Sequence, residues 1–262
     1  SRERHVPATT MTQNPLPPTA LVTGAAQRLG REIALHLARH GWAVGVHYKN
    51  SRSAADDLVG EIERQGGQAV TLQADLAQMK DVGRLVPECV SRLGPPTCLV
   101  NNASIYEWDS LATLASDAWD AHLNLNLKAP IFLAQAFAEA LPAEALGNVI
   151  NIIDQKVLRP DPDYFSYTAS KSALWNATQT MAQALAPRIR VNAVGPGPVF
   201  RSARQDETEF EHEWRSTPLR QRVSPEEICA AIQLILASPA MTGQMIALDS
   251  GQHLAWSGGK PD

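Results

Sequence analysis

The sequence predicts a doubly wound α/β fold: one domain with a seven-stranded parallel sheet and helices on both faces. From residue 20 onward, short apolar runs alternate with longer amphipathic segments. Most of the runs are apolar along their whole length, which is typical of strands buried on both faces. Strands joined by helical crossovers form parallel sheets. The expected strands are 20–22, 43–47, 69–72, 98–100, 149–153, 190–194 and 245–248.

Two of the crossover helices are clear in the pattern. Residues 28–40 form an amphipathic segment followed by Gly41, a residue type that often ends a helix. In residues 53–65, apolar residues recur every four positions, so they share one helix face. In a doubly wound sheet, ligands bind beyond the carboxyl ends of the strands. The residues that follow each strand are therefore the candidate functional residues.

Composition excludes several classes of protein. The 262 residues are 44% hydrophobic and 19% charged, which is enough for one large core and too apolar for a disordered chain. No apolar run approaches the ~18 residues of a membrane-spanning helix. A net charge of −4 argues against nucleic-acid binding. The three cysteines form no C-x-x-C pair, so we expect buried thiols and a reducing, cytoplasmic setting.

Residues 1–18 are predicted to be a flexible tail. They are polar, contain prolines and lack both helical periodicity and the apolar stretch of a signal peptide. Met11 is a candidate natural start, in which case residues 1–10 are either a remnant of expression or part of the tail. The folded domain is expected over residues 19–262.

A turn with two glycines follows the first strand. Its sequence is Thr23-Gly24-Ala25-Ala26-Gln27-Arg28-Leu29-Gly30. Glycines at a strand end and in the first helical turn let the backbone approach a pyrophosphate, which the helix N-terminus then binds through its N–H groups. The Arg28 guanidinium can add a charge-assisted contact to such an anion. Two glycines also suit an ordinary tight turn, but this position in the chain favours a dinucleotide site.

The end of the second strand favours NADP(H) over NAD. NAD-binding chains carry an acidic residue here for the ribose hydroxyls. This chain has His47-Tyr48-Lys49-Asn50-Ser51-Arg52, and its first acidic residue, Asp56, already belongs to the next helix. Lys49, Ser51 and Arg52 can bind a 2′-phosphate through charge and hydrogen bonds, although the segment also fits an ordinary polar loop.

A candidate acid–base group follows the fifth strand. Asp154 is the last residue of that strand or the one after it, and Tyr167 and Lys171 are four residues apart, so they share one helix face. A free tyrosine has a pKa of about 10, too high for efficient proton transfer at neutral pH. A nearby lysine ammonium favours the phenolate, so we expect Lys171 to lower the pKa of Tyr167.

Together these motifs resemble the short-chain dehydrogenase/reductase family over residues 19–256. The resemblance implies that Tyr167 donates a proton, that Lys171 holds the nicotinamide ribose, and that Asn126 supports a water relay. It also implies an NADP(H)-binding homotetramer. The motifs include Asp75, Asn101-Asn102-Ala103, Asn126 and the run Val191-Asn192-Ala193-Val194-Gly195-Pro196-Gly197. The implied cofactor-binding residues are Gly24, Arg28, Leu29, Gly30, His47, Tyr48, Lys49, Asn50, Ser51, Asp75, Leu76, Asn102, Ala103, Ser104, Tyr167, Lys171, Pro196, Gly197 and Val199.

Three departures from the usual family pattern resemble its pteridine reductase branch and the related dihydromonapterin reductase. Arg28, Ser104 and Asp154 stand where the family usually has Gly, Gly and Ser. The branch resemblance implies that Arg28 contacts cofactor phosphate and pterin, and that Ser104 contacts the pterin. Tyr106 would stack on its ring, and Asp154 would work with Tyr167. A carboxyl suits this role because it accepts hydrogen bonds from an aminopyrimidine edge and supports protonation at nitrogen.

The sequence therefore predicts an NADPH-dependent reductase of a pterin-like small molecule, with no metal, nucleic-acid or membrane partner. One alternative is a carbonyl or 3-oxoacyl reductase of the same family, and another is a non-catalytic NADP(H)-binding sensor. Lys49-Asn50 replaces a basic pair typical of pteridine reductases, so the grip on the 2′-phosphate is expected to be weaker. Residues 198–222 are expected to form a substrate lid in which Phe200, Phe210 and Trp214 pack internally.

Overall fold

The predicted sheet is present in the computed structural model, which describes residues 16–202 and 204–255. Seven strands pair in the order β3-β2-β1-β4-β5-β6-β7, all parallel. Most of the predicted tail lies outside the described residues. The strands are β1 (Thr19–Val22), β2 (Ala43–Tyr48), β3 (Ala69–Gln73), β4 (Cys98–Asn101), β5 (Gly147–Ile152), β6 (Ile189–Pro196) and β7 (Met245–Leu248).

Most strand bounds differ from the prediction by one or two residues. β5 ends at Ile152, one residue before the predicted end, while β6 runs two residues past its predicted end to Pro196. The extension follows from pairing, because Pro196 lies opposite Leu248 of β7 in the parallel register. Apolar runs report burial, whereas strand ends are set by the neighbouring strand.

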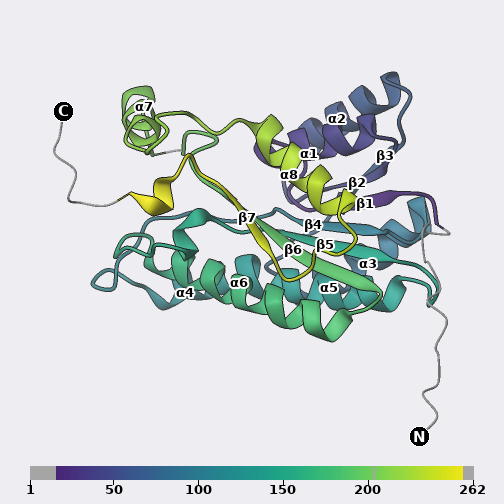
Figure 1. Ribbon diagram of the computed structural model, residues 1–262. Coiled ribbons are helices and arrows are strands. Elements are labelled where there is room, and N and C mark those ends of the chain that lie inside the picture. The colour runs from purple at the N-terminus through teal and green to yellow at the C-terminus, as the bar shows by residue number, and fades with distance from the viewer. Residues whose placement is uncertain (1–15, 203, 256–262) are drawn as a thin grey trace, which may run out of the picture.

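Helices cover both faces of the sheet (Figure 1). On one face lie α1 (Arg28–Arg39), α2 (Arg52–Arg64) and α8 (Pro225–Ala237). On the other lie α3 (Met79–Leu93), α4 (Ser116–His122), α5 (Ala129–Ala140) and α6 (Phe165–Leu185), with a π-helical turn at Leu123–Lys128 between α4 and α5. The predicted helices 28–40 and 53–65 each end one residue earlier than expected, and the second also begins one residue earlier. No helix within the described ranges is long and apolar enough to cross a membrane.

Each strand contributes alternate side chains to two separate hydrophobic cores. Ala20 and Val22 of β1 pack beneath α1, α2 and α8, whereas Leu21 between them packs beneath α3 and α5. All three are fully buried. A strand covered on both sides has no polar face, which is why these runs read as continuously apolar.

The ends of β1 and β4 are tied together where the strand order reverses. The Thr23 hydroxyl accepts hydrogen bonds from the backbone N–H groups of Asn102 (2.9 Å) and Ala103 (3.0 Å). The Asn102 side-chain amide donates back to the carbonyl oxygens of Thr23 (2.9 Å) and Gly24 (3.2 Å). Ligands of doubly wound folds bind at this reversal point, so these contacts fix the floor of any site there.

The segment predicted as a lid contains one helix, α7 (Glu207–Arg215), which stands apart from the two helical layers (Figure 1). Asp206 and Glu209 form a capping box at its start. Phe210 is 2% exposed, with the Arg222 guanidinium 5.2 Å from its ring centroid. The expected internal packing of Phe210 is confirmed.

The contact between α1 and the preceding loop yields a stability prediction. A Cβ on Gly30 would lie 2.1 Å from the Gly24 carbonyl oxygen, so Gly30→Ala should lower the free energy of unfolding by about 1–3 kcal/mol. Gly83 on α3 is a matched control because a Cβ there meets nothing within 4 Å, and Gly83→Ala should stabilise by about 0.5–1 kcal/mol. Urea denaturation measures both, and equal stability of the two variants would contradict the prediction.

Candidate active site

A cleft of about 510 Å³ lies beyond the carboxyl ends of the central strands. Its walls come from the loops after β1 and β4, the end of β5, the start of α6, the end of β6 and the segment 198–222. Acid–base residues and the loop after the first strand therefore meet in one place. The predicted site residues that line it are Arg28, Leu29, Asn102, Ser104, Tyr106, Asp154, Tyr167, Lys171, Pro196, Gly197 and Val199.

The loop after β1 has the backbone geometry that a dinucleotide phosphate requires. Gly24 has φ of 61°, in the left-handed region that favours glycine. Gly30 has no room for a side chain, so the first turn of α1 approaches the loop closely. The N-terminus of α1, a helix of 12 residues, then presents its unpaired N–H groups beside the cleft, as anion sites do.

His47, predicted to bind the cofactor, instead supports this loop from below. It is 2% exposed, and its Nδ1 accepts a hydrogen bond from the Gly24 N–H at 2.9 Å. Because Nδ1 is the acceptor, Nε2 carries the proton and donates to the Ala74 carbonyl oxygen at 3.1 Å. Burial lowers the pKa of His47 to about 4, so the imidazole is neutral at physiological pH.

Tyr48 and Leu76, also predicted to bind the cofactor, are core residues. Tyr48 is 6% exposed and packs beneath α1 and α2, whereas Leu76 is 3% exposed and packs beneath α3. Neither side chain lines the cleft. Both side chains pack toward a helix layer, so contact of either residue with the cofactor remains a prediction.

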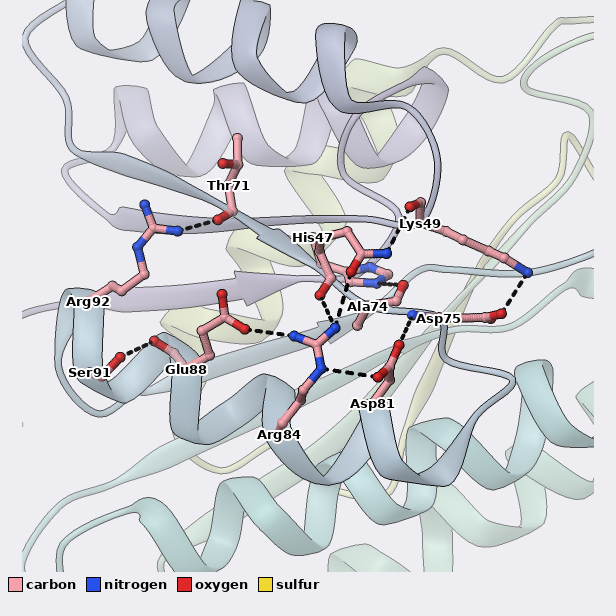
Figure 2. Close-up of polar contacts among 11 residues, drawn as sticks. His47, Lys49, Thr71, Ala74, Asp75, Asp81, Arg84, Glu88, Ser91 and Arg92 are labelled. Carbon is pink, nitrogen blue, oxygen red and sulfur yellow. Dashed lines mark hydrogen bonds and ion pairs between the residues drawn. The ribbon is translucent and has the colours of Figure 1, made fainter.

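Lys49, which is expected to bind a 2′-phosphate, forms an ion pair with Asp75 (Figure 2). The Lys49 ammonium lies 3.0 Å from the Asp75 carboxylate, and the Asp75 N–H donates to Asp81 at 2.7 Å. Arg84 of α3 donates both to Asp81 (3.0 Å) and to the Gln73 carbonyl oxygen at the end of β3 (2.7 Å). α3 thereby anchors the loop after β3, which carries Asp75, one of the cofactor-binding residues that the resemblance implies.

The two residues after Lys49, Asn50 and Ser51, are polar and reach the surface beyond the end of β2. Asn50 is exposed and Ser51 is partly exposed. Ser51 occupies the N-cap position of α2, yet its hydroxyl makes no capping hydrogen bond. The Ser51 hydroxyl and the Lys49 ammonium, two residues apart in the chain, are both groups that can donate hydrogen bonds to phosphate oxygens.

Tyr167, Asp154 and Lys171 form one buried polar group. The Tyr167 hydroxyl donates to Asp154 Oδ2 at 2.8 Å, and the Lys156 N–H donates to Asp154 Oδ1 at 2.8 Å. The Lys171 ammonium donates to the Ile152 carbonyl oxygen at 2.9 Å and lies 5.8 Å from the Tyr167 ring centroid. Spacing of four residues on α6 brings both side chains to the end of β5, as predicted.

The pKa of Tyr167 shifts in the direction opposite to the one expected. Burial, together with the adjacent Asp154 carboxylate, raises it well above its ordinary value. Burial likewise raises the pKa of Asp154 and lowers that of Lys171 to about 8. The prediction from Lys171 alone was wrong because it omitted desolvation and the facing carboxylate. A neutral phenol is the form that can donate a proton.

Asn126, which is expected to support a water relay, also holds the loop after β4 through its side chain. It is fully buried in the π-helical turn, and its side-chain amide donates to the Ile105 carbonyl oxygen (3.0 Å) and to Ser170 (3.2 Å). Its carbonyl oxygen accepts from the Ile105 N–H (3.0 Å) and from Ser104 (3.2 Å). Since these contacts occupy the side chain, Asn126 fixes the loop after β4 and has no free side-chain group for a water.

Tyr106 stands over the acid–base group with a second aromatic ring. Its ring stacks on Tyr164, with centroids 4.2 Å apart and planes inclined by 8°. It also meets the Tyr167 ring edge to face at 4.7 Å. Tyr106 is 45% exposed, so part of its surface faces solvent.

Arg28 bridges the start of α1 and the segment 198–222. Its guanidinium donates to the Arg201 carbonyl oxygen at 3.0 Å and lies 5.5 Å from the Phe200 ring centroid. It has φ of 53°, unusual for a residue with a side chain. Phe200, predicted to pack within the lid, packs partly against the core beneath α1 and also lines the cleft. Arg28 lines the cleft as well, so its guanidinium is accessible to a bound anion.

Comparison with protein families identifies the chain. The family model for short chain dehydrogenase matches residues 18–212. The chain belongs to this family. Among curated proteins, the 3-oxoacyl-[acyl-carrier-protein] reductase of Synechocystis sp. is 33% identical over 236 residues, which cover 88% of this chain and 95% of that protein.

Solved structures extend the likeness of this short-chain dehydrogenase. FolM alternative dihydrofolate reductase 1 from Brucella canis, crystallised with NADP, has a TM-score of 0.90 and 45% identity over 94% of this chain and 96% of its own. A metagenomic blue fluorescent protein in complex with NADPH has a TM-score of 0.84 and 30% identity, covering 91% of this chain and 99% of its own.

Sequence reasoning missed several residues of this short-chain dehydrogenase. Lys156 binds Asp154 through its backbone and contributes its side chain to the cleft wall. Tyr164 could have been found from its position three residues before Tyr167, which places an aromatic at the start of the same helix. Asp109, His122 and Ser166, which form a buried network described below, carry no local signal because they meet only in the folded chain.

The buried neutral His47 generates a pH prediction. Its pKa is about 4 in the folded protein and 6.5 ordinarily, so below pH 6.5 the unfolded chain binds a proton that the folded chain does not. Stability is therefore lost as pH falls. From about pH 7 to about pH 5, His47 should lower the free energy of unfolding by about 2 kcal/mol.

The His47→Gln variant tests this prediction because glutamine can keep both hydrogen bonds and does not titrate. Urea denaturation at the two pH values should give a smaller acid loss for the variant, by about 2 kcal/mol. Identical losses in the wild type and the variant would contradict the assignment of a neutral imidazole.

Proposed function

We propose that this chain is an NADPH-dependent reductase that adds hydride to a pterin-like substrate, with Tyr167 as the proton donor. The observation that carries the proposal is the 2.8 Å hydrogen bond from the Tyr167 hydroxyl to Asp154, which lines the cleft. This contact places a carboxyl at the reacting end of the cleft, where the family usually has a serine hydroxyl.

NADP(H) fits the residues present. The close contact of Gly30 with Gly24 leaves a cradle that a Cβ would fill, and Asn102 fixes its far wall. Lys49 and Ser51 would hold the 2′-phosphate, and Lys171 the nicotinamide ribose. The neighbouring structures from Brucella and from the metagenome contain NADP and NADPH. When bound, NADPH supplies a hydride, and the protein must supply the matching proton.

The protonation states of the acid–base group suit reduction. Tyr167 has a raised pKa, so it holds its proton until a substrate atom accepts it. When a C=N bond is reduced, carbon takes the hydride and nitrogen takes the proton, which leaves a C–H and an N–H bond. Lys171, with a pKa of about 8, is mainly cationic at neutral pH and stabilises the phenolate that remains.

The walls of the cleft suit a flat polar ring. Asp154 offers carboxylate oxygens to the N–H groups of an aminopyrimidine edge, which a serine hydroxyl cannot match. Tyr106 offers an aromatic face, and Gln205 and Glu213 add polar groups from the segment 198–222. The likeness to an alternative dihydrofolate reductase, whose substrate contains a pterin ring, supports the same class.

Reduction of a 3-oxoacyl thioester or a ketone is the second candidate. It is favoured by curated relatives that are named 3-oxoacyl-[acyl-carrier-protein] reductases, two of which are 33% and 31% identical, and by the Tyr167–Lys171 pair that carbonyl reduction also uses. A non-catalytic NADP(H)-binding sensor would not need that pair.

Oxidation of NADPH with a panel of substrates separates these functions. Dihydropterins and dihydrofolate should be reduced faster than 3-oxoacyl thioesters or ketones, and Tyr167→Phe should lower kcat about 100-fold or more with NADPH affinity unchanged. Turnover of oxoacyl or ketone substrates without any dihydropterin turnover would overturn the substrate class. NADPH binding without turnover of any substrate would favour the sensor.

The Asp154→Ser variant tests the role of the carboxyl. It restores the residue usual in the family, so kcat/KM for the dihydropterin should fall about 100-fold or more while the binding of NADPH is retained. Any ketone activity of the wild type should survive, because a serine hydroxyl can polarise a carbonyl. Full dihydropterin activity in the variant would show that the carboxyl is dispensable.

A further inference from the structure

A buried network joins the loop after β4 to the start of α6, beneath the acid–base group. Asp109, His122 and Ser166 are 5%, 1% and 0% exposed, and none belongs to the predicted site. The Ser166 hydroxyl donates to Asp109 Oδ2, and the Ser166 N–H donates to Asp109 Oδ1 at 3.1 Å. The carboxylate thus caps the first turn of α6 from a residue distant in the chain.

His122 completes the network, and its tautomer determines which group donates in each hydrogen bond. Its Nε2 lies 3.4 Å from the Glu107 N–H, which can only donate, so Nδ1 carries the ring proton. Nδ1 lies 2.8 Å from the Ser166 hydroxyl and 3.0 Å from the Ala118 carbonyl oxygen of its own helix. Hydrogen bonds therefore run from Glu107 through His122 and Ser166 to Asp109. We call Asp109, His122 and Ser166 the buried clamp.

The buried clamp is the inner part of a longer contact between two segments. Outside it, the Trp108 indole N–H donates to Asp163 at 3.2 Å, and the Phe165 N–H donates to the Asp109 carbonyl oxygen at 3.3 Å. Next to these contacts, the rings of Tyr106 and Tyr164 stack. Residues 106–109 therefore lie side by side with residues 163–166.

Both segments end at residues of the proposed chemistry. Tyr106 directly precedes Glu107, and Tyr167 directly follows Ser166. The Tyr167 ring lies edge to face against two other rings. Its centroid is 4.7 Å from that of Tyr106 and 6.2 Å from that of His122. A shift of the loop after β4 against α6 would move the Tyr106 ring relative to the Tyr167 hydroxyl.

We propose that Asp109, His122 and Ser166 are positioning residues that hold the substrate-stacking Tyr106 in register with the proton donor Tyr167. The roles of the two tyrosines rest on the proposed function, whereas the coupling of the two segments does not. Misplacement of a reacting group by about 1 Å costs as much as about 100-fold in rate, so loosening this contact should affect turnover more than cofactor binding.

Two variants break the buried clamp without a large change in volume. Ser166→Ala removes the central hydroxyl. Asp109→Asn keeps the shape, but an amide has one acceptor where the carboxylate has two, so either the Ser166 N–H or its hydroxyl loses its acceptor. Thr178→Val is the matched control, because Thr178 is a fully buried hydroxyl on the same helix, bonded to Asn151 at 2.8 Å and outside the cleft lining.

The first measurement is amide hydrogen exchange of the protein without cofactor or substrate. Both clamp variants should accelerate exchange in residues 105–110 and in the first turn of α6 by about 10-fold, with little change in the strands. Thr178→Val should leave these segments unchanged. Exchange that is unchanged, or that rises uniformly in the clamp variants and the control, would overturn the coupling whatever the substrate is.

The second measurement separates positioning from general stability. Below the temperature of unfolding, Ser166→Ala and Asp109→Asn should lower kcat about 10-fold on the best substrate of the panel, while the KM for NADPH stays within about 2-fold. Thr178→Val should retain wild-type kcat at a comparable loss of Tm. Wild-type kcat in both clamp variants would reduce the network to a purely structural role.

The two proposals fail in distinguishable ways. Local acceleration of exchange without any dihydropterin turnover would overturn the pterin substrate and support the buried clamp. Dihydropterin turnover that stays the same in both clamp variants would support the pterin substrate and overturn the positioning role of the buried clamp.

Discussion

The hydrogen bonds between Thr23 and the loop after β4 are the constraint on which the rest of the site depends. At this point the sheet order reverses, so the chain leaves β1 toward one helical layer and β4 toward the other. The ladder between β1 and β4 ends at Val22 and Val100, so the loops beyond need contacts of their own to stay together. Thr23 and Asn102 close the gap with reciprocal hydrogen bonds, which give the phosphate loop and the substrate loop one common floor.

Electrostatics at the other end of the cleft follow from burial. Asp154 and Tyr167 share a partly buried hydrogen bond, and desolvation raises the pKa of both. Asp154 disfavours a negative charge on Tyr167, whereas the hydrogen bond that Tyr167 donates favours the charged carboxylate of Asp154, so the phenol is the group that keeps its proton. Lys171 opposes this trend from the same helix. A site that begins protonated and tolerates one negative charge is suited to giving a proton away.

The sequence predicted what depends on local pattern and on strand order. Apolar runs located all seven strands, and the four-residue spacing of Tyr167 and Lys171 placed both on one helix face at the end of β5. The direction of the Tyr167 pKa shift could not be predicted, because it depends on Asp154, which reaches the phenol only through the fold. His47 has no local signal for facing inward, since its partners, Gly24 and Ala74, belong to other strand ends.

The ion pair of Lys49 and Asp75 lies at a different part of the sheet edge from Tyr167 and Asp154. Lys49 is 53% exposed on its side chain, its ion-pair partner is a strand-end carboxylate, and the network behind Asp75 is anchored by α3. Tyr167 lies on α6 and Asp154 follows β5, and β1 and β4 lie between β5 and the strand that precedes Lys49. Substitutions at Lys49 therefore require no repacking of the core. If Lys49 holds the 2′-phosphate as proposed, discrimination between the phosphorylated and unphosphorylated dinucleotide is an adjustable surface property that can change while Tyr167 and Asp154 stay in place.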